Sequence, residues 1–187
     1  MTEIDNAVNA LQKGEIVLYP TDTLYALGVD VGNRDALKKL YALKGREEGK
    51  QTSVLVSDME MAEKYGVFSS KARALAEKFL PGPLTLVVPK KGKEDETIGI
   101  RIPDHEFSLE LVKAFGGPIT ATSANVSGEE SKTTVQEILE QFGDKSQEID
   151  MVVDHGKMPG TPSTVAQVID GNIVVLREGA IQKELLL

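Results

Sequence analysis

The amino-acid sequence predicts an α/β protein with a twisted, mixed β-sheet and helices packed against it. Short apolar runs typical of strands alternate along the chain with segments whose apolar residues recur every three or four positions, as in amphipathic helices. Two strand-like runs are joined by Asp170-Gly171, a strong hairpin signal, so at least one pair of strands is antiparallel. With 187 residues and neither an internal repeat nor a long linker, we expect residues 1–187 to form a single domain.

The first half of the chain is divided by capping residues and by breaks in the apolar pattern. Thr2, with Asp5 three residues later, and Asn33 are placed to cap two helices, and glycines at 14 and 45 are placed to end them. The elements expected here are a helix from 2 to 14, a strand at 16–19, a helix from 33 to 45, a buried strand at 53–56 and a helix at 69–79. The Pro-Gly-Pro sequence at 81–83 ends the last of these.

The second half contains more strands than the first. Thr134 and Glu137 form a capping box that opens a helix, which Gly143 is placed to end. The charged residues 90–95 look like an exposed connection between two strands of a hairpin. The other elements expected are strands at 84–88, 98–102, 119–122, 151–153, 164–169 and 173–177, and a helix at 109–115.

Charge and missing residue types limit the chemistry that the chain can perform. The formal net charge of −8 argues against broad, sequence-independent binding of nucleic acid, although a local basic pocket remains compatible with it. The chain has no cysteine, and His105 and His155 are too far apart in sequence for a local metal motif. We therefore expect no protein metal site, and chemistry that uses hydroxyl, amide, carboxylate, lysine and arginine groups.

No stretch of the sequence approaches the roughly 18 apolar residues that a membrane span requires. The N-terminal residues also lack a basic leader followed by an apolar run. We expect no membrane association and a cytoplasmic location.

Four polar clusters, at 20–23, 44–50, 122–128 and 160–164, follow strands or interrupt apolar patterns. Each has an ordinary interpretation: threonines in a turn satisfy backbone groups, and Lys44 and Arg46 are cations of the kind favoured at a helix C-terminus. Each cluster also has a functional interpretation. Lysine and arginine bind phosphates, and Ser123 and Asn125 can hold phosphate oxygens without adding charge.

Two arginines occupy strands and have two interpretations each. Arg101 lies between isoleucines, so it points either to solvent or into a cleft, where its planar fork would suit a carboxylate. Arg177, at the end of the last strand, has the same alternatives. Asp154-His155 suggests no nucleophilic triad, because the chain lacks a Gly-x-Ser-x-Gly elbow, and the lysines at 90–93 are more typical of a solvated turn than of an RNA contact.

Taken together and in this order, the clusters resemble the YrdC/Sua5 family. The resemblance covers residues from about Ile4 to Arg177 and is carried by 19–28 (YPTDTLYALG), 44–46 (KGR), 81–86 (PGPLTL), 99–103 (GIRIP), 123–128 (SANVSG) and 163–165 (STV). It implies the short, single-domain form of that family's fold, with a central concave cleft. It also implies a threonylcarbamoyl-AMP synthase, which makes threonylcarbamoyl-AMP and pyrophosphate from L-threonine, bicarbonate or CO2, and ATP. The product serves the N6-threonylcarbamoyladenosine modification of tRNA position 37.

The resemblance assigns roles to particular residues. The family's catalytic tetrad falls on Lys44, Arg46, Ser123 and Asn125. ATP contacts are implied at Arg46, Lys50, Thr97, Ser123, Ser131 and Arg177. Threonine contacts are implied at Thr23, Leu55, Arg101, Ala121 and Ser163. A magnesium ion held mainly by phosphate and water is expected with the nucleotide.

Two other functions remain open at this point. The same fold is also associated with double-stranded RNA binding and ribosome assembly, for which the net charge would allow only a local basic patch. A carbamoyl-transfer domain of hydrogenase maturation is disfavoured, because the chain lacks the zinc-finger and acylphosphatase-like segments that accompany that domain. The expected partners are the three substrates and the tRNA-modification machinery that uses the product.

Overall fold

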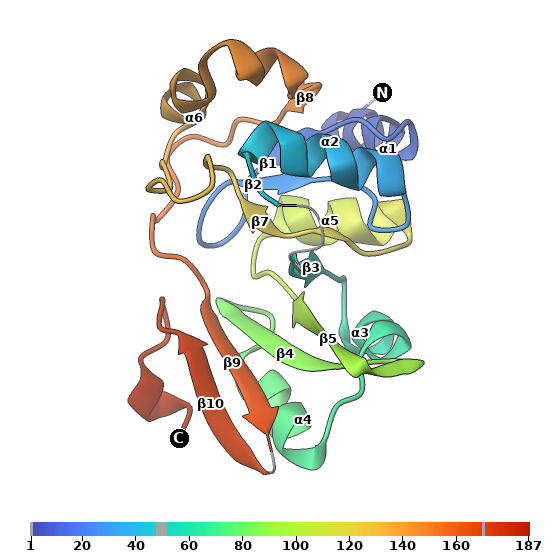
Figure 1. Ribbon diagram of the computed structural model, residues 1–187, viewed down its shortest axis with the longest axis vertical. Helices are drawn as coiled ribbons and strands as arrows, with labels where there is room; N and C mark the ends of the chain where they lie inside the picture. The colour runs from blue at the N-terminus through green and yellow to red at the C-terminus, as the bar shows by residue number, and fades with distance from the viewer. Residues whose placement is uncertain (1, 48–51, 170) are drawn as a thin grey trace.

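The computed structural model describes residues 2–47, 52–169 and 171–187, and its helices and strands alternate along the chain as the sequence predicts (Figure 1). The helices are α1 (Glu3–Gln12), α2 (Arg34–Lys44), α3 (Met59–Tyr65), α4 (Ser70–Phe79), α5 (Glu106–Phe115) and α6 (Val135–Phe142), with short 3-10 helices η1 (Gly143–Glu148) and η2 (Lys183–Leu185). The strands are β1 (Val17–Tyr19), β2 (Ala26–Gly28), β3 (Val54–Leu55), β4 (Leu84–Lys90), β5 (Lys93–Arg101), β6 (Ile119–Thr120), β7 (Thr122–Ser123), β8 (Met151–Val152), β9 (Thr164–Ile169) and β10 (Asn172–Arg177).

The strands form two mixed sheets where the sequence suggested one. The smaller sheet has the order β7-β2-β1-β8, and the larger has the order β10-β9-β4-β5-β3-β6. Each sheet combines parallel and antiparallel pairs: β1 is parallel to β8 and antiparallel to β2, and β4 is parallel to β9 and antiparallel to β5. The expected hairpin of β9 and β10 is antiparallel, as predicted. The α/β class and the mixed pairing are thus confirmed, and the division into two sheets is new.

Helix ends agree best with the sequence, because they depend on local hydrogen bonds. Thr2 and Asp5 make the expected reciprocal capping box on α1, and Thr134 and Glu137 make the second one on α6. The Asn33 side chain accepts from two backbone amides at the start of α2. Gly45 ends that helix with a φ of 62°, a conformation that glycine adopts at little cost.

Three differences from the expected elements have local causes. Helix α3 was not predicted, because it is seven residues long and buries only Ala62, so its sequence shows no periodic apolar face. Strand β2 is only three residues long and follows a polar loop. Strand β5 begins at Lys93, within the segment expected to be an exposed connection, because it pairs antiparallel with β4 as far as Lys90↔Lys93. Lys90 also donates to Glu96 across this pair (3.2 Å).

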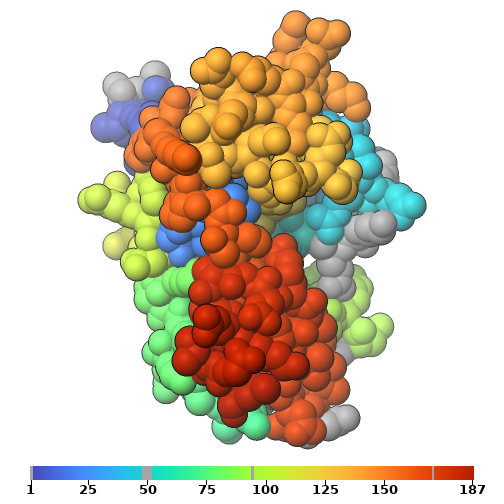
Figure 2. All heavy atoms as spheres, turned by 90° about the vertical axis from the view of Figure 1, so that its left-hand side faces the viewer, coloured from blue at the N-terminus to red at the C-terminus, as the bar shows by residue number. Residues whose placement is uncertain are grey.

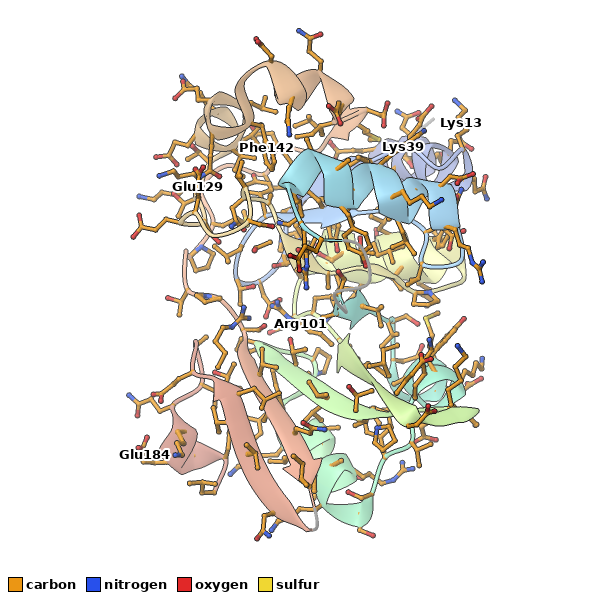
Figure 3. The ribbon with its side chains drawn as sticks, viewed as in Figure 1. Lys13, Lys39, Arg101, Glu129, Phe142 and Glu184 are labelled. Atoms are coloured by element: carbon orange, nitrogen blue, oxygen red, sulfur yellow. The ribbon has the colours of Figure 1, made fainter. Side chains whose placement is uncertain are left out.

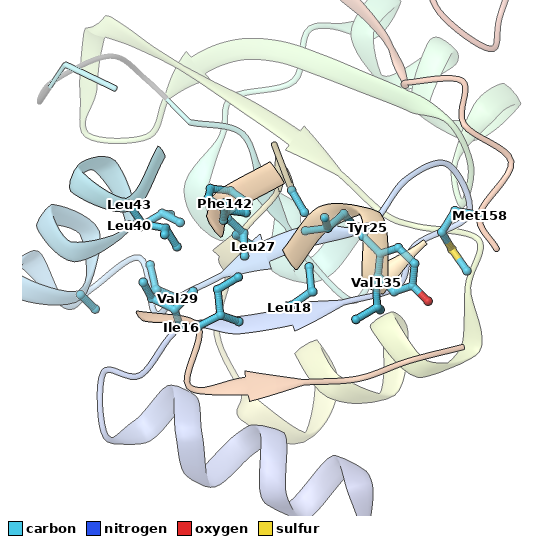
Figure 4. Packing of buried hydrophobic residues seen from close by; sticks show 14 residues of the cluster. Ile16, Leu18, Tyr25, Leu27, Val29, Leu40, Leu43, Val135, Phe142 and Met158 are labelled. Carbon is cyan, nitrogen blue, oxygen red and sulfur yellow. The ribbon is translucent and has the colours of Figure 1, made fainter. Parts of the chain in front are cut away.

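Apolar side chains fill the space on both sides of the sheets. The cluster of Figure 4 packs α2 and α6 against one face of β1 and β2, with Leu18, Leu27 and Phe142 among its members. A second cluster joins α1 and α5 to the other face of the smaller sheet, and it includes Leu55 and Ile119 of the larger sheet. A third covers the larger sheet with α3 and α4. The second cluster therefore ties the two sheets into one body.

The chain crosses from the larger sheet to the smaller one between β6 and β7. Thr120 is fully buried there; its backbone amide donates to the Val29 carbonyl (3.0 Å), and its hydroxyl donates to the Leu27 carbonyl (2.9 Å). The amide of Ala121, at the crossing, donates to the carbonyl of Ser53 (2.7 Å). On another face, the orange segment after β8 runs down to the red half that holds β9 and β10 (Figure 2).

Candidate functional site

A cavity of about 220 Å³ lies where the two sheets meet. Its walls come from the loop after β1, the end of α2, the strands at the crossing and the ends of β5 and β10. The lining residues with proposed roles are Thr23, Arg46, Leu55, Arg101, Ala121, Ser123, Ser163 and Arg177. Segments that are far apart in the sequence therefore meet around one space. Figure 3 shows Arg101 between the upper and lower halves of the molecule.

A second, more open hollow adjoins the first. It is lined by Lys44, Gly45, Arg46, Glu47, Thr122, Ser123, Asn125, Ser127 and Gly128. Arg46 and Ser123 line both spaces, so the two form one continuous site. All four residues of the expected tetrad lie on its walls.

The loop after β1 is held in shape by Thr21. Its buried hydroxyl donates to the Leu24 carbonyl (2.6 Å), accepts from the amides of residues 23 and 24, and lies 3.1 Å from the Thr23 hydroxyl. The turn expected from the hydroxyls is thus present. It also brings Thr23 to the cavity wall, and a binding role for Thr23 stays a prediction.

Arg101 points into the space between the sheets and away from solvent. Its Nη1 donates to Thr23 Oγ1 (2.9 Å), its Nη2 donates to Asp22 Oδ1 (2.5 Å), and its Nε donates to the Gly82 carbonyl (3.3 Å). Burial lowers the pKa of Arg101 from its ordinary value, and the neighbouring Asp22 carboxylate opposes that shift. The guanidinium remains charged, because the ordinary pKa of arginine lies far above neutral pH.

Ser163 lies between Thr85 and Arg177. Its hydroxyl is 2.9 Å from the Thr85 hydroxyl and accepts from Arg177 Nη2 (3.2 Å). Nε and Nη2 of Arg177 also donate to the Ser163 carbonyl, at 3.2 and 2.8 Å. Burial, and after it the charge of Arg101, lowers the pKa of Arg177.

Lys44 is buried, and its ammonium group holds a backbone turn. Nζ donates to the carbonyl of Asn125 (2.8 Å) and to that of Ser123. The Ser123 hydroxyl donates to the amide oxygen of Asn125, whose nitrogen donates to the carbonyls of Val126 and Glu129. Burial, with a smaller contribution from Arg46, lowers the pKa of Lys44 to about 7. The lysine thus fixes the loop on which the tetrad's serine and asparagine stand.

Three further residues expected at the ATP site have different positions. The Ser131 hydroxyl lies 3.4 Å from Asn125 Oδ1, and Ser131 is not among the described residues that line either space. Thr97 lies in β5 opposite Pro89 and is not among the residues that line either space. Lys50 lies outside the described residues.

Sequence reasoning missed two polar residues of the site. Asp22 belongs to the cluster at 20–23 but was given no role, and its contact with Arg101 depends on two strands from different sheets. Thr85 is buried in β4, and in the sequence it looks like an ordinary strand residue. No local signal in the sequence would have found Thr85, whereas a carboxylate beside a hydroxyl-rich turn was a usable hint for Asp22.

The cavity carries an excess of positive charge. Three guanidinium groups, those of Arg46, Arg101 and Arg177, line it, and no carboxylate among the described residues does. A space with this lining suits ligands that carry several negative charges or a carboxylate.

The described residues contain neither a candidate metal cluster nor a helix suited to crossing a membrane. No group of three or more histidine, aspartate or glutamate side chains there could hold a metal ion. His105 and His155 lie together with ring centroids 5.8 Å apart, and His155 Nε2 lies 3.2 Å from Glu3 Oε2, which is a pairing of surface elements away from the cavity. No helix in the described ranges is long and apolar enough to cross a membrane.

Comparison with known proteins places the chain among relatives of the same architecture. Residues 9–179 match the Sua5/YciO/YrdC family, whose description is telomere recombination. A protein of Methanocaldococcus jannaschii, provisionally named threonylcarbamoyl-AMP synthase, is 42% identical over 174 residues, which are 90% of this chain and 81% of that protein. The threonylcarbamoyl-AMP synthase of Bacillus subtilis is 38% identical over 192 residues, covering 97% of this chain and 55% of the relative.

A solved structure agrees with the sequence comparison. The crystal structure of Pyrococcus abyssi Sua5 complexed with L-threonine superposes with a TM-score of 0.90 at 32% identity. The match covers 98% of this chain and 56% of that one. The chain thus spans most of the Methanocaldococcus relative and a little over half the length of the Bacillus and Pyrococcus proteins.

Proposed function

Because the chain belongs to the Sua5/YciO/YrdC family, we propose that it is a threonylcarbamoyl-AMP synthase, and that residues 1–187 work as one YrdC-like domain. The reaction joins L-threonine, bicarbonate or CO2, and ATP to give threonylcarbamoyl-AMP and pyrophosphate. The observation that carries the proposal is the meeting of Lys44, Arg46, Ser123 and Asn125 around a space that continues into the cavity beside Arg101.

The proposed division of the site follows its charges and shapes. The amino acid occupies the enclosed cavity, with its carboxylate on Arg101 and its polar groups near Thr23 and Ser163. Leu55 and Ala121 supply the apolar wall for its methyl group.

The nucleotide extends into the open hollow. Arg46 and Ser123, which line both spaces, and Arg177, which lines the enclosed cavity, are proposed to contact its phosphates. Ser131, whose hydroxyl lies 3.4 Å from Asn125 Oδ1, stays a predicted ATP contact. Lys50 and Thr97 stay predicted ATP contacts. Magnesium is proposed to arrive with ATP and to be bound mainly by phosphate and water oxygens.

The chemistry requires positioning and charge neutralisation more than a covalent nucleophile. The threonine amine forms a carbamate with bicarbonate or CO2, and a carbamate oxygen then attacks the α-phosphorus of ATP, which expels pyrophosphate. Arg46 and Arg177 would stabilise the negative charge that develops on the phosphoryl oxygens, and the cavity would hold the carbamate in line. The product is proposed to pass to a transferase that modifies adenosine 37 of tRNA. A cytoplasmic location stays a prediction.

The test is substrate dependence of the purified protein. We expect pyrophosphate and an adenylated product from ATP, magnesium, bicarbonate and L-threonine, and background rates when any one of these is omitted or when threonine is replaced by valine. Arg46→Gln should lower kcat/KM by on the order of 100-fold, because a donor to the developing charge is lost. Arg34→Gln, which changes an exposed cation at the start of α2, the helix that precedes Arg46, is the matched control.

Two outcomes would contradict the proposal. One is pyrophosphate release that does not depend on threonine. The other is steeply salt-dependent binding of double-stranded RNA without ATP turnover, which would favour an RNA-binding role instead.

A further inference from the structure

The side chains of Asp22 and Arg101 form an ion pair that is almost sealed from solvent. Asp22 Oδ1 accepts from Arg101 Nη2 at 2.5 Å, and the two side chains are only 11% and 8% exposed. The partners come from different sheets: Asp22 follows β1, and Arg101 ends β5. A buried ion pair of this kind holds both side chains in place, because separating them would leave a buried charge without a partner, at a large cost in free energy.

The remaining contacts of Arg101 leave a defined part of its fork available. A guanidinium has five N–H groups: one on Nε and two on each terminal nitrogen. Nε donates to the Gly82 carbonyl, Nη1 donates to Thr23 Oγ1, and Nη2 donates to Asp22. Among the described residues this leaves one N–H on Nη1 and one on Nη2. These two N–H groups are available to a carboxylate, which accepts charge-assisted hydrogen bonds from a guanidinium.

The Asp22 carboxylate itself does not line the cavity. It is absent from the cavity wall, where Thr23 and Arg101 lie, and it lines a third, open hollow together with Thr23, Gly82 and Asp104. Its second oxygen, Oδ2, is buried and receives no hydrogen bond from the described part of the chain. A buried polar atom without a partner is uncommon in native proteins, which suggests that this carboxylate is held for its effect on Arg101.

We propose that Asp22 is a positioning residue that holds the Arg101 guanidinium in the orientation required to receive the carboxylate of the amino-acid substrate. The inference rests on the proposed function, and it assigns Asp22 no contact with the substrate. In Asp22→Asn a neutral amide oxygen replaces the carboxylate as the acceptor of Nη2, so the charge-assisted hydrogen bond that holds the fork is lost and the orientation depends mainly on Thr23 and Gly82.

A purely electrostatic role and a positioning role of Asp22 predict opposite changes in the KM for threonine when the carboxylate is removed. If Asp22 acted only through its negative charge, which opposes that of Arg101, Asp22→Asn would strengthen binding of an anionic substrate group and lower the KM for threonine. If it positions the fork, the same substitution raises this KM. The sign of the change therefore distinguishes the two roles.

The experiment measures threonine-dependent pyrophosphate release at saturating ATP and bicarbonate. We expect Asp22→Asn to raise the KM for L-threonine at least tenfold and to change kcat less than threefold, since Asp22 does not border the nucleotide hollow. Asp104→Asn makes the same charge change at an exposed neighbouring position and should leave both constants unchanged. In an Arg101→Lys background, Asp22→Asn should add little further loss, because the fork it positions is gone.

A KM for Asp22→Asn that is unchanged or lower, or a full additional loss in the Arg101→Lys background, would overturn the inference. Thermal unfolding establishes whether each variant is folded. Should Asp22→Asn not fold, Asp22→Glu decides, because it keeps the negative charge but moves the carboxylate by one methylene: a rise in KM of at least threefold supports the inference, and an unchanged KM overturns it. A wild-type protein without threonine-dependent turnover would instead refute the proposed function.

Discussion

Lys44 combines a buried charge with a structural task. Its Nζ donates to the carbonyls of Ser123 and Asn125, and its pKa is lowered to about 7 by burial and by Arg46. In the unfolded chain the ordinary value of 10.5 applies. Between these two values the unfolded state binds more protons on this residue than the folded state does, so this group makes the protein more stable as the pH rises.

The prediction is a pH-dependent difference between the wild type and Lys44→Met. From pH 7 to 9, the wild-type free energy of unfolding should gain relative to the variant by up to ~1.4 kcal/mol per pH unit, and the advantage should shrink as the pH falls towards 7. Chemical denaturation over a pH series measures it. Lys39→Met, on the exposed face of the same helix, should show no such slope relative to wild type, and parallel pH curves for wild type and Lys44→Met would contradict the prediction.

At the level of single residues, the sequence identified the types that line the site but not their contacts. Arg101 had two interpretations, solvent or cleft, because a strand alone does not say which of its faces is covered. The structure places it in the cleft, since β1 and its following loop lie across that face. Lys44 was expected to hold phosphate, whereas its hydrogen bonds go to the backbone of the loop at 123–125.

Strand β6 is two residues long and joins the two sheets. Its Thr120 hydroxyl accepts from the Val29 amide (3.0 Å) and donates to the Leu27 carbonyl (2.9 Å), and its carbonyl accepts from the Tyr19 hydroxyl (2.7 Å). Two segments of the smaller sheet, β1 and β2 with the residue after it, are thus bonded to one residue of the larger sheet. This makes β6 more important to the fold than its length suggests.

Thr120→Val should therefore destabilise the protein by about 1–3 kcal/mol, because a buried amide and a buried carbonyl both lose their partner while the volume stays nearly the same. Thr120→Ser keeps the hydroxyl and should cost less. Urea unfolding at constant pH measures both values, and a loss for Thr120→Val that is no larger than the loss for Thr120→Ser would contradict the prediction that the hydroxyl makes the larger contribution.

Elements with local signals were predicted well, and elements made by pairing were not. Helices α1, α2 and α6 have capping side chains within three residues, and each begins where the sequence indicated. The run at 119–122 was expected to be one strand, but it is divided between β6 and β7, because its two ends pair with different sheets. Such a division depends on residues that are distant in the sequence, the nearest pair being Leu55 and Ile119, and it has no local signature.

The whole molecule places its cavity between two sheets that share a core through α1 and α5. A ligand bound there contacts both sheets and stabilises the folded state by mass action. The convergence of the tetrad could be predicted only from the family resemblance, since no spacing in the sequence brings 44–46 next to 123–125. The two spaces and their common wall at Arg46 and Ser123 emerge only from the fold.

We expect a non-hydrolysable ATP analogue and L-threonine, each at about 100 times its dissociation constant, to raise the midpoint of thermal unfolding by about 5–10 °C for each ligand. Arg101→Lys should lose most of the threonine part and keep the nucleotide part, because lysine offers no planar fork for a carboxylate. Differential scanning calorimetry measures the shifts. An equal response of Arg101→Lys and wild type to threonine would refute the carboxylate role of Arg101.

The bonds from Arg177 to Ser163 have a consequence for any titration of this protein. Arg177 is proposed to contact the nucleotide, and Ser163 is proposed to contact the amino acid. Yet the Arg177 guanidinium donates to both the hydroxyl and the carbonyl oxygen of Ser163. A substrate that alters the contact between Arg177 and Ser163 when it binds therefore changes the affinity for the other substrate. Thermodynamic reciprocity makes the two changes in affinity equal. An affinity measured for either substrate alone is then an apparent constant, and the meaningful quantity is a binding surface mapped against both concentrations.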